Sequence, residues 1–312
     1  MKSGNYLAYA GALINALIVG LSFLFTKTAV TISTPLDTLA FRFTIAFLTL
    51  LFLILFKFVK VDLKIKSFYK IIPLTLFYPS AFFTFQAFGL ETVPSSEAGI
   101  LFATIPIITM LFASLFLKEQ TTILQKLSIF ASVFGVIYIF VMKGSTVSLT
   151  NYSGILLLLL SCISLSGYTV LARSLVKTFK PAELTFFMLG IGFVFFNIAA
   201  LVKHSTTNSI ELMLEPWSNI EFVVAIFFLG LLASLVTSFV SNYILSKISA
   251  SQMSVFSNLS TVVSIVAGVL ILNEKIYMFH IVGSVLIIFG VIGTNIYKDK
   301  KRKKVMRPRM IN

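Results

Sequence analysis

Residues 98–119, AGILFATIPIITMLFASLFLKE, begin with 20 consecutive uncharged residues and end on Lys118 and Glu119. A bilayer core about 30 Å thick requires roughly 20 apolar residues for one helical crossing, so this stretch predicts a transmembrane helix. Its residues do not alternate between apolar and polar, as the strands of a membrane barrel do. The stretch therefore indicates a helical membrane protein.

The same pattern recurs along the whole chain of 312 residues. Hydrophobic residues make up 58% of it, charged residues make up 12%, and the mean hydropathy is +0.99. A soluble domain contains about 25% charged residues, so these values exclude a water-soluble globular fold. Division at the charges gives ten apolar stretches: Tyr6–Phe25, Leu39–Phe56, Ile71–Phe88, Ala98–Leu117, Leu127–Met142, Ser153–Ala172, Leu184–Val202, Phe222–Leu245, Gln252–Leu272 and Tyr277–Tyr297.

The charges predict how the chain is oriented in the membrane. Ten crossings place both termini on one side, and cytoplasmic termini put 20 Lys and Arg residues inside and 5 outside. This distribution follows the positive-inside rule. The formal net charge of +14 therefore reflects topology in a plasma-membrane protein. We interpret the basic tail, residues 298–312, as a contact with anionic lipid headgroups at the cytoplasmic face rather than as a nucleic-acid arm.

The two halves of the chain are related by weak sequence similarity. Leu117-Lys118-Glu119 corresponds to Leu272-Asn273-Glu274 at an offset of 155 residues. Earlier in each half the offset is 146, which aligns Pro35-Leu36-Asp37 with Pro181-Ala182-Glu183. Each half then contains five crossings. Because five is odd, the second copy must cross the membrane in the opposite sense to the first.

The predicted fold is an all-α membrane protein with ten transmembrane helices in two inverted five-helix repeats around a central cavity. We assign the repeats to residues 1–145 and 146–297, followed by the cytoplasmic tail 298–312. Inverted duplication is typical of secondary transporters, in which one unit rocks against the other to expose a site to either side.

These residues resemble a known family. Leu117-Lys118-Glu119 and Leu272-Asn273-Glu274 look like the LxE ends of helices 4 and 9 in ten-helix EamA-domain members of the drug/metabolite transporter superfamily. Pro106 resembles the proline of helix 4, and residues 89–98 resemble the connection before it. The resemblance covers residues 6–297. It implies a basket of helices 1–4 and 6–9 around a cavity, with helices 5 and 10 outside, and export or exchange of amino acids, metabolites or drugs.

Polar side chains inside the apolar stretches are the candidate binding groups, because lipid disfavours polar groups that have no partner. Positions 234, 237, 238, 241 and 242 lie on one helical face, and a similar polar face follows in the next stretch. Ser and Thr have an alternative role, since they also bond to their own helix; the two tyrosines fit core packing equally well. The proposed substrate-binding residues are Asn15, Ser22, Tyr78, Gln86, Tyr168, Ser238, Asn242 and Asn258.

Small residues in the fifth and tenth stretches indicate close helix packing instead of binding. The fifth stretch carries Ser128, Ser132 and Gly135, and the tenth carries Gly283, Gly290 and Gly293. These residues would let two helix backbones approach each other closely.

The ten apolar stretches contain no Asp or Glu, and Arg42 is the deepest charge. We expect Arg42 to extend outward to the headgroups or to pair with Asp37; binding a substrate carboxylate is the alternative. Glu119 and Glu274 are expected to cap neighbouring helix ends. A proton-coupled pump usually keeps a carboxylate within the membrane, so the sequence favours a facilitator or exchanger.

The expected function is alternating-access transport of small polar metabolites, such as amino acids, related solutes or drugs, by a monomer or homodimer. We expect no enzyme activity, metal or cofactor, because HExxH and clustered His or Cys are missing from the sequence and Cys162 is its single cysteine. A membrane-embedded enzyme and a non-transporting structural subunit are the alternatives.

Overall fold

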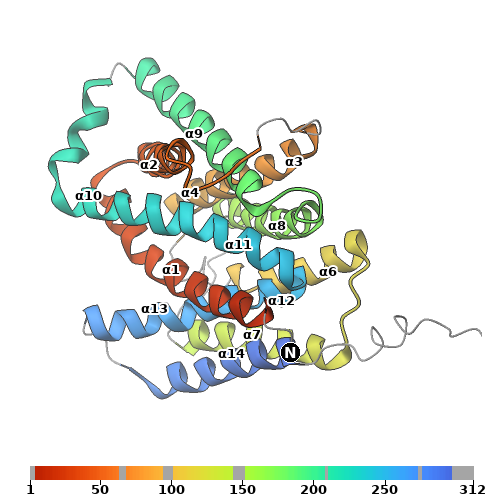
Figure 1. Ribbon diagram of the computed structural model, residues 1–312. Helices are drawn as coiled ribbons and strands as arrows, with labels where there is room; N and C mark the ends of the chain where they lie inside the picture. The colour runs from red at the N-terminus through yellow and green to blue at the C-terminus, as the bar shows by residue number, and fades with distance from the viewer. Residues whose placement is uncertain are drawn as a thin grey trace, which may run out of the picture.

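A computed structural model describes residues 4–62, 68–93, 101–142, 152–207, 210–272 and 276–296. Within these ranges the chain forms helices and turns and no strand (Figure 1). Seven helical segments are long and apolar enough to cross a membrane: α1 (Gly4–Ile32), α2 (Pro35–Leu55), α7 (Ile123–Met142), α8 (Tyr152–Leu175), α9 (Pro181–Thr206), the continuous segment Ile220–Lys247, and α14 (Met278–Ile296).

The other three crossings are interrupted or short. The third consists of α3 (Ile72–Thr75), η2 (Leu76–Ala81) and α4 (Phe82–Thr92), the fourth of α6 (Ile105–Leu117), and the ninth of α12 (Ala250–Ser254) and α13 (Phe256–Leu272). The long segment 220–247 divides into α10 (Ile220–Phe227), η5 (Phe228–Val236) and α11 (Thr237–Lys247). Two short connections are η1 (Phe68–Lys70) and η4 (Ile210–Ser218). The ten predicted crossings are thereby confirmed.

Several helices begin or end further into the polar sequence than hydropathy predicts. Helix α1 continues to Ile32 instead of ending at Phe25, and α2 begins at Pro35 instead of Leu39. The hydroxyl of Thr34 caps α2 by accepting a hydrogen bond from the backbone N–H of Asp37, and proline is favourable in the first turn. Local capping therefore sets the start of α2, which an apolar average does not detect.

Helices α7 and α14 form a tightly packed pair at one side of the bundle (Figure 1). A Cβ added at Gly135 would lie 2.7 Å from the carbonyl oxygen of Gly283, and one added at Gly290 would lie 2.5 Å from that of Ser128. The offset of 155 relates Gly135 to Gly290 and Ser128 to Gly283. The two contacts are therefore the same contact repeated by a pseudo-two-fold axis, and the predicted small-residue packing is confirmed.

The remaining helices show the same symmetry. Helix α1 packs on α11 and α13, and its counterpart α8 packs on α4 and α6. Gly20 of α1 meets the backbone of Ser260, while the corresponding Ser166 of α8 lies 3.4 Å from the carbonyl oxygen of Ile105. Since Ile105 and Ser260 are also 155 residues apart, both repeats use the same helix contact.

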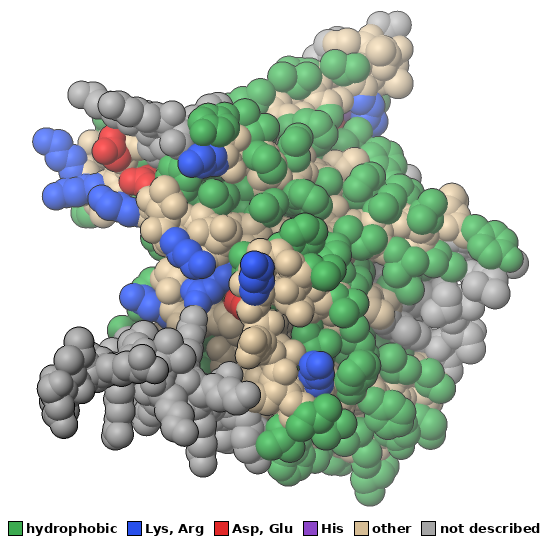
Figure 2. All heavy atoms as spheres, turned by 90° about the vertical axis from the view of Figure 1, so that its right-hand side faces the viewer, with side chains coloured by type: hydrophobic (Ala, Val, Ile, Leu, Met, Phe, Trp, Pro, Cys, Tyr) green, Lys and Arg blue, Asp and Glu red, His purple; other side chains and the backbone are tan. Residues whose placement is uncertain are grey.

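The outer surface of the bundle is apolar, as contact with lipid requires. Leu115, Phe116 and Phe134 are exposed over more than half of their surface. Figure 2 shows hydrophobic side chains over much of one face, with Lys and Arg gathered toward its left edge. So large an exposed apolar area is unusual for a soluble protein and fits a membrane environment.

The α7–α14 contact yields a stability prediction. Gly135→Leu places a side chain against the backbone of Gly283, and overpacking of this kind costs about 1–3 kcal/mol. We expect a lower thermal midpoint of the purified protein in detergent. Phe134→Leu, at the exposed neighbouring position, is the control and should leave the midpoint nearly unchanged. An unaltered midpoint in Gly135→Leu would contradict the close contact.

Candidate functional site

The polar face predicted for the eighth crossing lies in the interior of the bundle. Its five residues are all less than 9% exposed: Ser234, Thr237, Ser238, Ser241 and Asn242. Thr237 donates its hydroxyl hydrogen bond to the carbonyl of Ala233 in its own helix, which is the alternative role for this residue type. Ser234 and Asn242 bond to neighbouring helices instead, so the polar face is an internal surface of the protein.

Asn242 joins three helices through its amide. Its Nδ2 donates to Oγ1 of Thr185 on α9 at 3.0 Å, and its Oδ1 accepts from the hydroxyl of Tyr168 on α8 at 3.2 Å. Asn242 is fully buried and Tyr168 is 3% exposed. Buried amides require such partners. Asn242 therefore links α8, α9 and α11 in the interior of the bundle.

Tyr78 extends this cluster to the third crossing. Its ring stacks on Tyr168 with centroids 4.7 Å apart. The backbone of Tyr78 is extended, at φ −147° and ψ 122°, because Pro79 disfavours a helical conformation at the residue before it. The interruption of the helix therefore places the Tyr78 ring against Tyr168, and the next residue, Pro79, is buried beside Gly192 of α9.

Two further interior groups lie beside Tyr78. The hydroxyl of Ser238 on α11 faces the phenol of Tyr78, and Ser238 is 2% exposed. Arg42 of α2 is 6% exposed, and its guanidinium lies 4.5 Å from the ring centroid of Phe83. We define the interior cluster as Arg42, Tyr78, Tyr168, Ser238 and Asn242.

The expected behaviour of Arg42 was wrong. Arg42 does not extend to the surface, and it does not pair with Asp37. Its Nε donates to Oγ of Ser234 at 2.6 Å and its Nη2 donates to the carbonyl oxygen of Ala233 at 2.8 Å. Five residues along a helix correspond to a rotation of about 140°, so Asp37 and Arg42 face different neighbours.

The structure brings together four of the eight predicted binding residues, Tyr78, Tyr168, Ser238 and Asn242. Asn258 instead donates to Oγ of Ser132 on α7 at 3.1 Å, which joins it to the packing pair α7–α14.

The other three predicted residues are less closely connected. Ser22 bonds to the carbonyl of Val19 in its own helix at 2.7 Å. Asn15 is half-buried on α1, with its Oδ1 buried and unpartnered in the described structure, and Gln86 is half-buried on α4.

At one end of the bundle, polar contacts connect several helices through Glu119. We call it the Glu119 end. Lys118 ends α6 in the left-handed conformation (φ 52°), which turns the chain so that Glu119 faces α12. The Glu119 carboxylate accepts hydrogen bonds from the backbone N–H of Ala250 (3.2 Å) and from Ser251, as a negative charge at a helix N-terminus should. The predicted capping role of Glu119 is confirmed. Glu274, its counterpart, lies outside the described residues.

Arg173 extends this network to two more helices, α8 and α11. Its Nε lies 3.8 Å from Oε1 of Glu119, and its Nη1 donates to the carbonyl of Leu245. Residues of α6, α8, α11 and α12 therefore meet at this end. Sequence reasoning missed Arg173, because its partners are more than 50 residues away.

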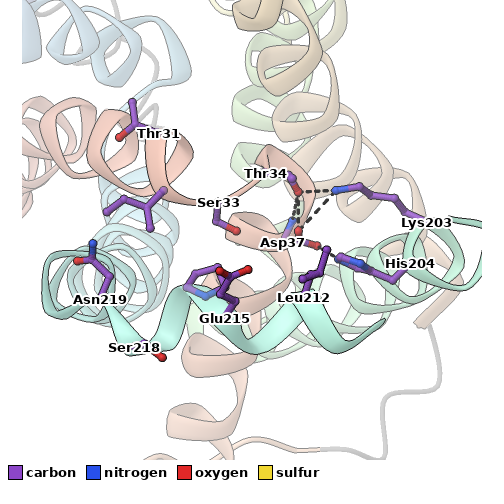
Figure 3. Close-up of a pocket in the computed structure, with 12 residues that line it drawn as sticks. Thr31, Ser33, Thr34, Asp37, Lys203, His204, Leu212, Glu215, Ser218 and Asn219 are labelled. Atoms are coloured by element: carbon purple, nitrogen blue, oxygen red, sulfur yellow. Dashed lines mark hydrogen bonds and ion pairs between the residues drawn. The ribbon is translucent and has the colours of Figure 1, made fainter. Parts of the chain in front are cut away.

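The opposite end, the Asp37 end, contains a pocket of about 670 Å³. Figure 3 shows Asp37 grouped with Thr34, Lys203 and His204, and Leu212 and Glu215 of η4 also line the pocket. The Asp37 carboxylate lies 2.8 Å from Nε2 of His204 and 3.5 Å from Nζ of Lys203. Lys203 balances the charge of Asp37. Nothing in the sequence points to His204 as a partner, because 167 residues separate it from Asp37.

The comparisons with known proteins agree with this architecture. Two segments of the chain, residues 6–141 and 152–296, match the EamA-like transporter family. The chain belongs to the EamA-like transporter family. The resemblance to EamA-domain members of the drug/metabolite transporter superfamily is thereby confirmed, together with the all-α membrane fold and its inverted repeat.

Individual relatives support the assignment over nearly the full length. The uncharacterized transporter YcxC of Bacillus subtilis (strain 168) is 48% identical over 96% of each chain. An uncharacterized transporter of Archaeoglobus fulgidus is 27% identical, over 87% of this EamA-like chain and 92% of its own. A solved crystal structure with 15% identity superimposes with a TM-score of 0.77, covering 94% of this chain and 96% of that one, which shows the shared fold.

Asn242 provides a test of the interior cluster. Asn242→Ala leaves the hydroxyls of Tyr168 and Thr185 without their partner, and a buried polar group without a partner costs about 1–3 kcal/mol. We expect a clear fall in the thermal midpoint of the purified protein. Asn295→Ala is the matched control, because Nδ2 of Asn295 donates to Val291 in its own helix. Equal shifts in the two variants would contradict the bridging role of Asn242.

Proposed function

We propose that this protein transports small polar metabolites across the plasma membrane by alternating access, with amino acids and related solutes as the first candidates and drugs as further ones. The observation that carries the proposal is the interior cluster. Its tyrosines and Asn242 offer neutral hydrogen-bonding groups and aromatic surface deep inside a lipid-facing bundle. A solute that loses its water on entry needs such groups.

The asymmetry between the two ends supports alternating access. At the Glu119 end, residues of four helices are connected by ionic and hydrogen-bond contacts. At the Asp37 end, a pocket opens between α1, α2, α9 and η4. Two repeats that cross the membrane in opposite senses are able to exchange these roles. We therefore propose that the Glu119 end is closed in this conformation.

We propose that the Glu119 end faces the cytoplasm, because the loops and termini assigned to that side carry 20 of the 25 Lys and Arg residues. The two repeats are proposed to divide at residues 145 and 146, and the direction to be export or exchange. We do not propose an enzyme, because the interior cluster has no pair of a nucleophile and a base within hydrogen-bond distance among the described residues.

Flux measurements test the transport function. Protein reconstituted into vesicles loaded with an unlabelled amino acid mixture should accumulate labelled amino acids by counterflow, while protein-free vesicles should not. Asn242→Ala should lower the flux at equal protein content more than Asn258→Ala does, because Asn258 contacts the packing pair instead of the interior cluster. No protein-dependent flux across a broad panel of neutral and zwitterionic metabolites would refute the proposal.

Cysteine labelling tests the closure at the Glu119 end. Glu119→Gln keeps the shape but loses the charge, and a loss of about 1 kcal/mol in the closed state corresponds to about a fivefold shift toward the open one. In a Cys162→Ala background, Ser254→Cys, which is 6% exposed, should react about fivefold faster with a polar maleimide when Glu119→Gln is added.

The exposed loop position Lys177→Cys is the matched control for that experiment. Its labelling rate should be the same with and without Glu119→Gln. An unchanged rate at position 254 would show that Glu119 does not hold this end closed.

A further inference from the structure

Arg42 carries a positive charge that no described carboxylate neutralises. Burial of a charge is costly unless it is paired, and an ionisable group inside a membrane usually marks a functional site. The nearest acidic residue along α2 is Asp37, but its carboxylate is engaged by Lys203 and His204. Among the described residues, the groups beside Arg42 are a serine hydroxyl, a backbone carbonyl, the ring of Phe83 and the phenol of Tyr78, and none of them is a carboxylate.

Arg42 also retains free hydrogen-bonding capacity. A guanidinium has five N–H donors, and the described structure uses two of them, on Ser234 and Ala233. Both contacts lie in η5, near the middle of the long segment 220–247. They hold the guanidinium at the depth of the membrane interior, while the remaining donors have no acceptor among the described residues.

A second observation lies beside the first one. Ser238, one turn beyond Ser234, has a buried hydroxyl that faces Tyr78. Arg42, Phe83, Tyr78 and Tyr168 form a continuous series, since Phe83 lies 5.3 Å from Tyr78 and Tyr78 lies 4.7 Å from Tyr168 between ring centroids. The series leads from the guanidinium of Arg42 along the aromatic rings of Phe83, Tyr78 and Tyr168. It ends at Asn242, which accepts a hydrogen bond from Tyr168.

We infer that Arg42 is the anchor for a carboxylate group of the transported solute, and that the solute carries an apolar or aromatic body. This inference rests on the proposed transport function and names its substrate class. One guanidinium balances one negative charge, and its planar donors match the two oxygens of a carboxylate. The Phe83–Tyr78–Tyr168 wall contacts the body of the solute, and the hydroxyl of Ser238 supplies a further polar contact.

The two repeats differ at this position. The offset of 146 aligns Arg42 with Met188, whose sulfur lies 3.6 Å from the amide of Asn242. The site therefore has a cation on the side of the first repeat and uncharged groups on the side of the second. A solute with its carboxylate at one end fits such a polarised site.

Matched ligand pairs test the inference by thermal stabilisation of the purified full-length protein. The probes are 3-phenylpropanoate and 3-phenylpropanamide, which differ in charge but have nearly the same shape. The carboxylate should stabilise the protein with an apparent affinity about tenfold to a hundredfold higher than the amide, which is the range for a charge-assisted hydrogen bond.

In Arg42→Gln the ratio of the apparent affinities for the carboxylate and the amide should fall to about one, because the cation is gone while the aromatic wall remains. Lys177→Gln removes an exposed cation from a loop and is the control, with the preference expected to remain. If Arg42→Gln does not fold, Arg42→Lys carries the test: it keeps the charge but loses the planar donors, and should reduce the preference severalfold.

Several outcomes would overturn the inference. Equal stabilisation by the acid and the amide, no stabilisation by a panel of aromatic and aliphatic carboxylates, or an unchanged preference in the Arg42 variant would each do so. A stabilisation that follows chloride concentration, with no effect of the carboxylates, would identify a site for inorganic anions and would also overturn it. Flux of a neutral or cationic solute that is unaffected in Arg42→Gln would refute the carboxylate anchor but leave transport itself intact.

Discussion

The rest of this structure depends on one constraint: a polar group inside a bilayer must find its partner within the protein, because lipid offers none. Most described interior groups obey it. Tyr168 and Thr185 each bond to Asn242, and Ser22 and Thr237 bond to their own helices. Arg42 is different, because among the described residues its charge meets no carboxylate. Both Arg42 and the buried hydroxyl of Ser238 lie beside Tyr78.

The inverted repeat imposes symmetry on packing but not on polar chemistry. Reciprocal contacts at Gly135 and Gly290 fix α7 against α14 in the same way from both repeats. Side chains in the interior do not follow this symmetry, since Arg42 in the first repeat corresponds to Met188 in the second. In the transport cycle that we propose, the symmetric frame would let the two ends of the bundle open and close in similar ways, while the asymmetric interior would give a bound solute one orientation.

The ionic groups at the two ends of the bundle connect different numbers of helices. Glu119 lies at the N-terminus of α12 and near Arg173, so breaking this group would separate four helices. Asp37, by contrast, lies within one wall of a pocket, where Lys203 and His204 belong to the single neighbouring helix α9. The ionic contacts at the Glu119 end therefore connect more helices than those beside the pocket at the Asp37 end.

The sequence by itself determined the ten crossings, the inverted repeat, the small-residue packing faces of the fifth and tenth crossings, and the polar face of the eighth. These features depend on composition, chain length and local periodicity, which a single sequence carries. Only the tertiary structure decided that Arg42 meets Ser234, that His204 meets Asp37, and that Asn258 faces α7. Those pairs lie 126 to 192 residues apart, and their contacts depend on which helix faces meet. Periodicity reveals that a face exists, but only packing determines its neighbour.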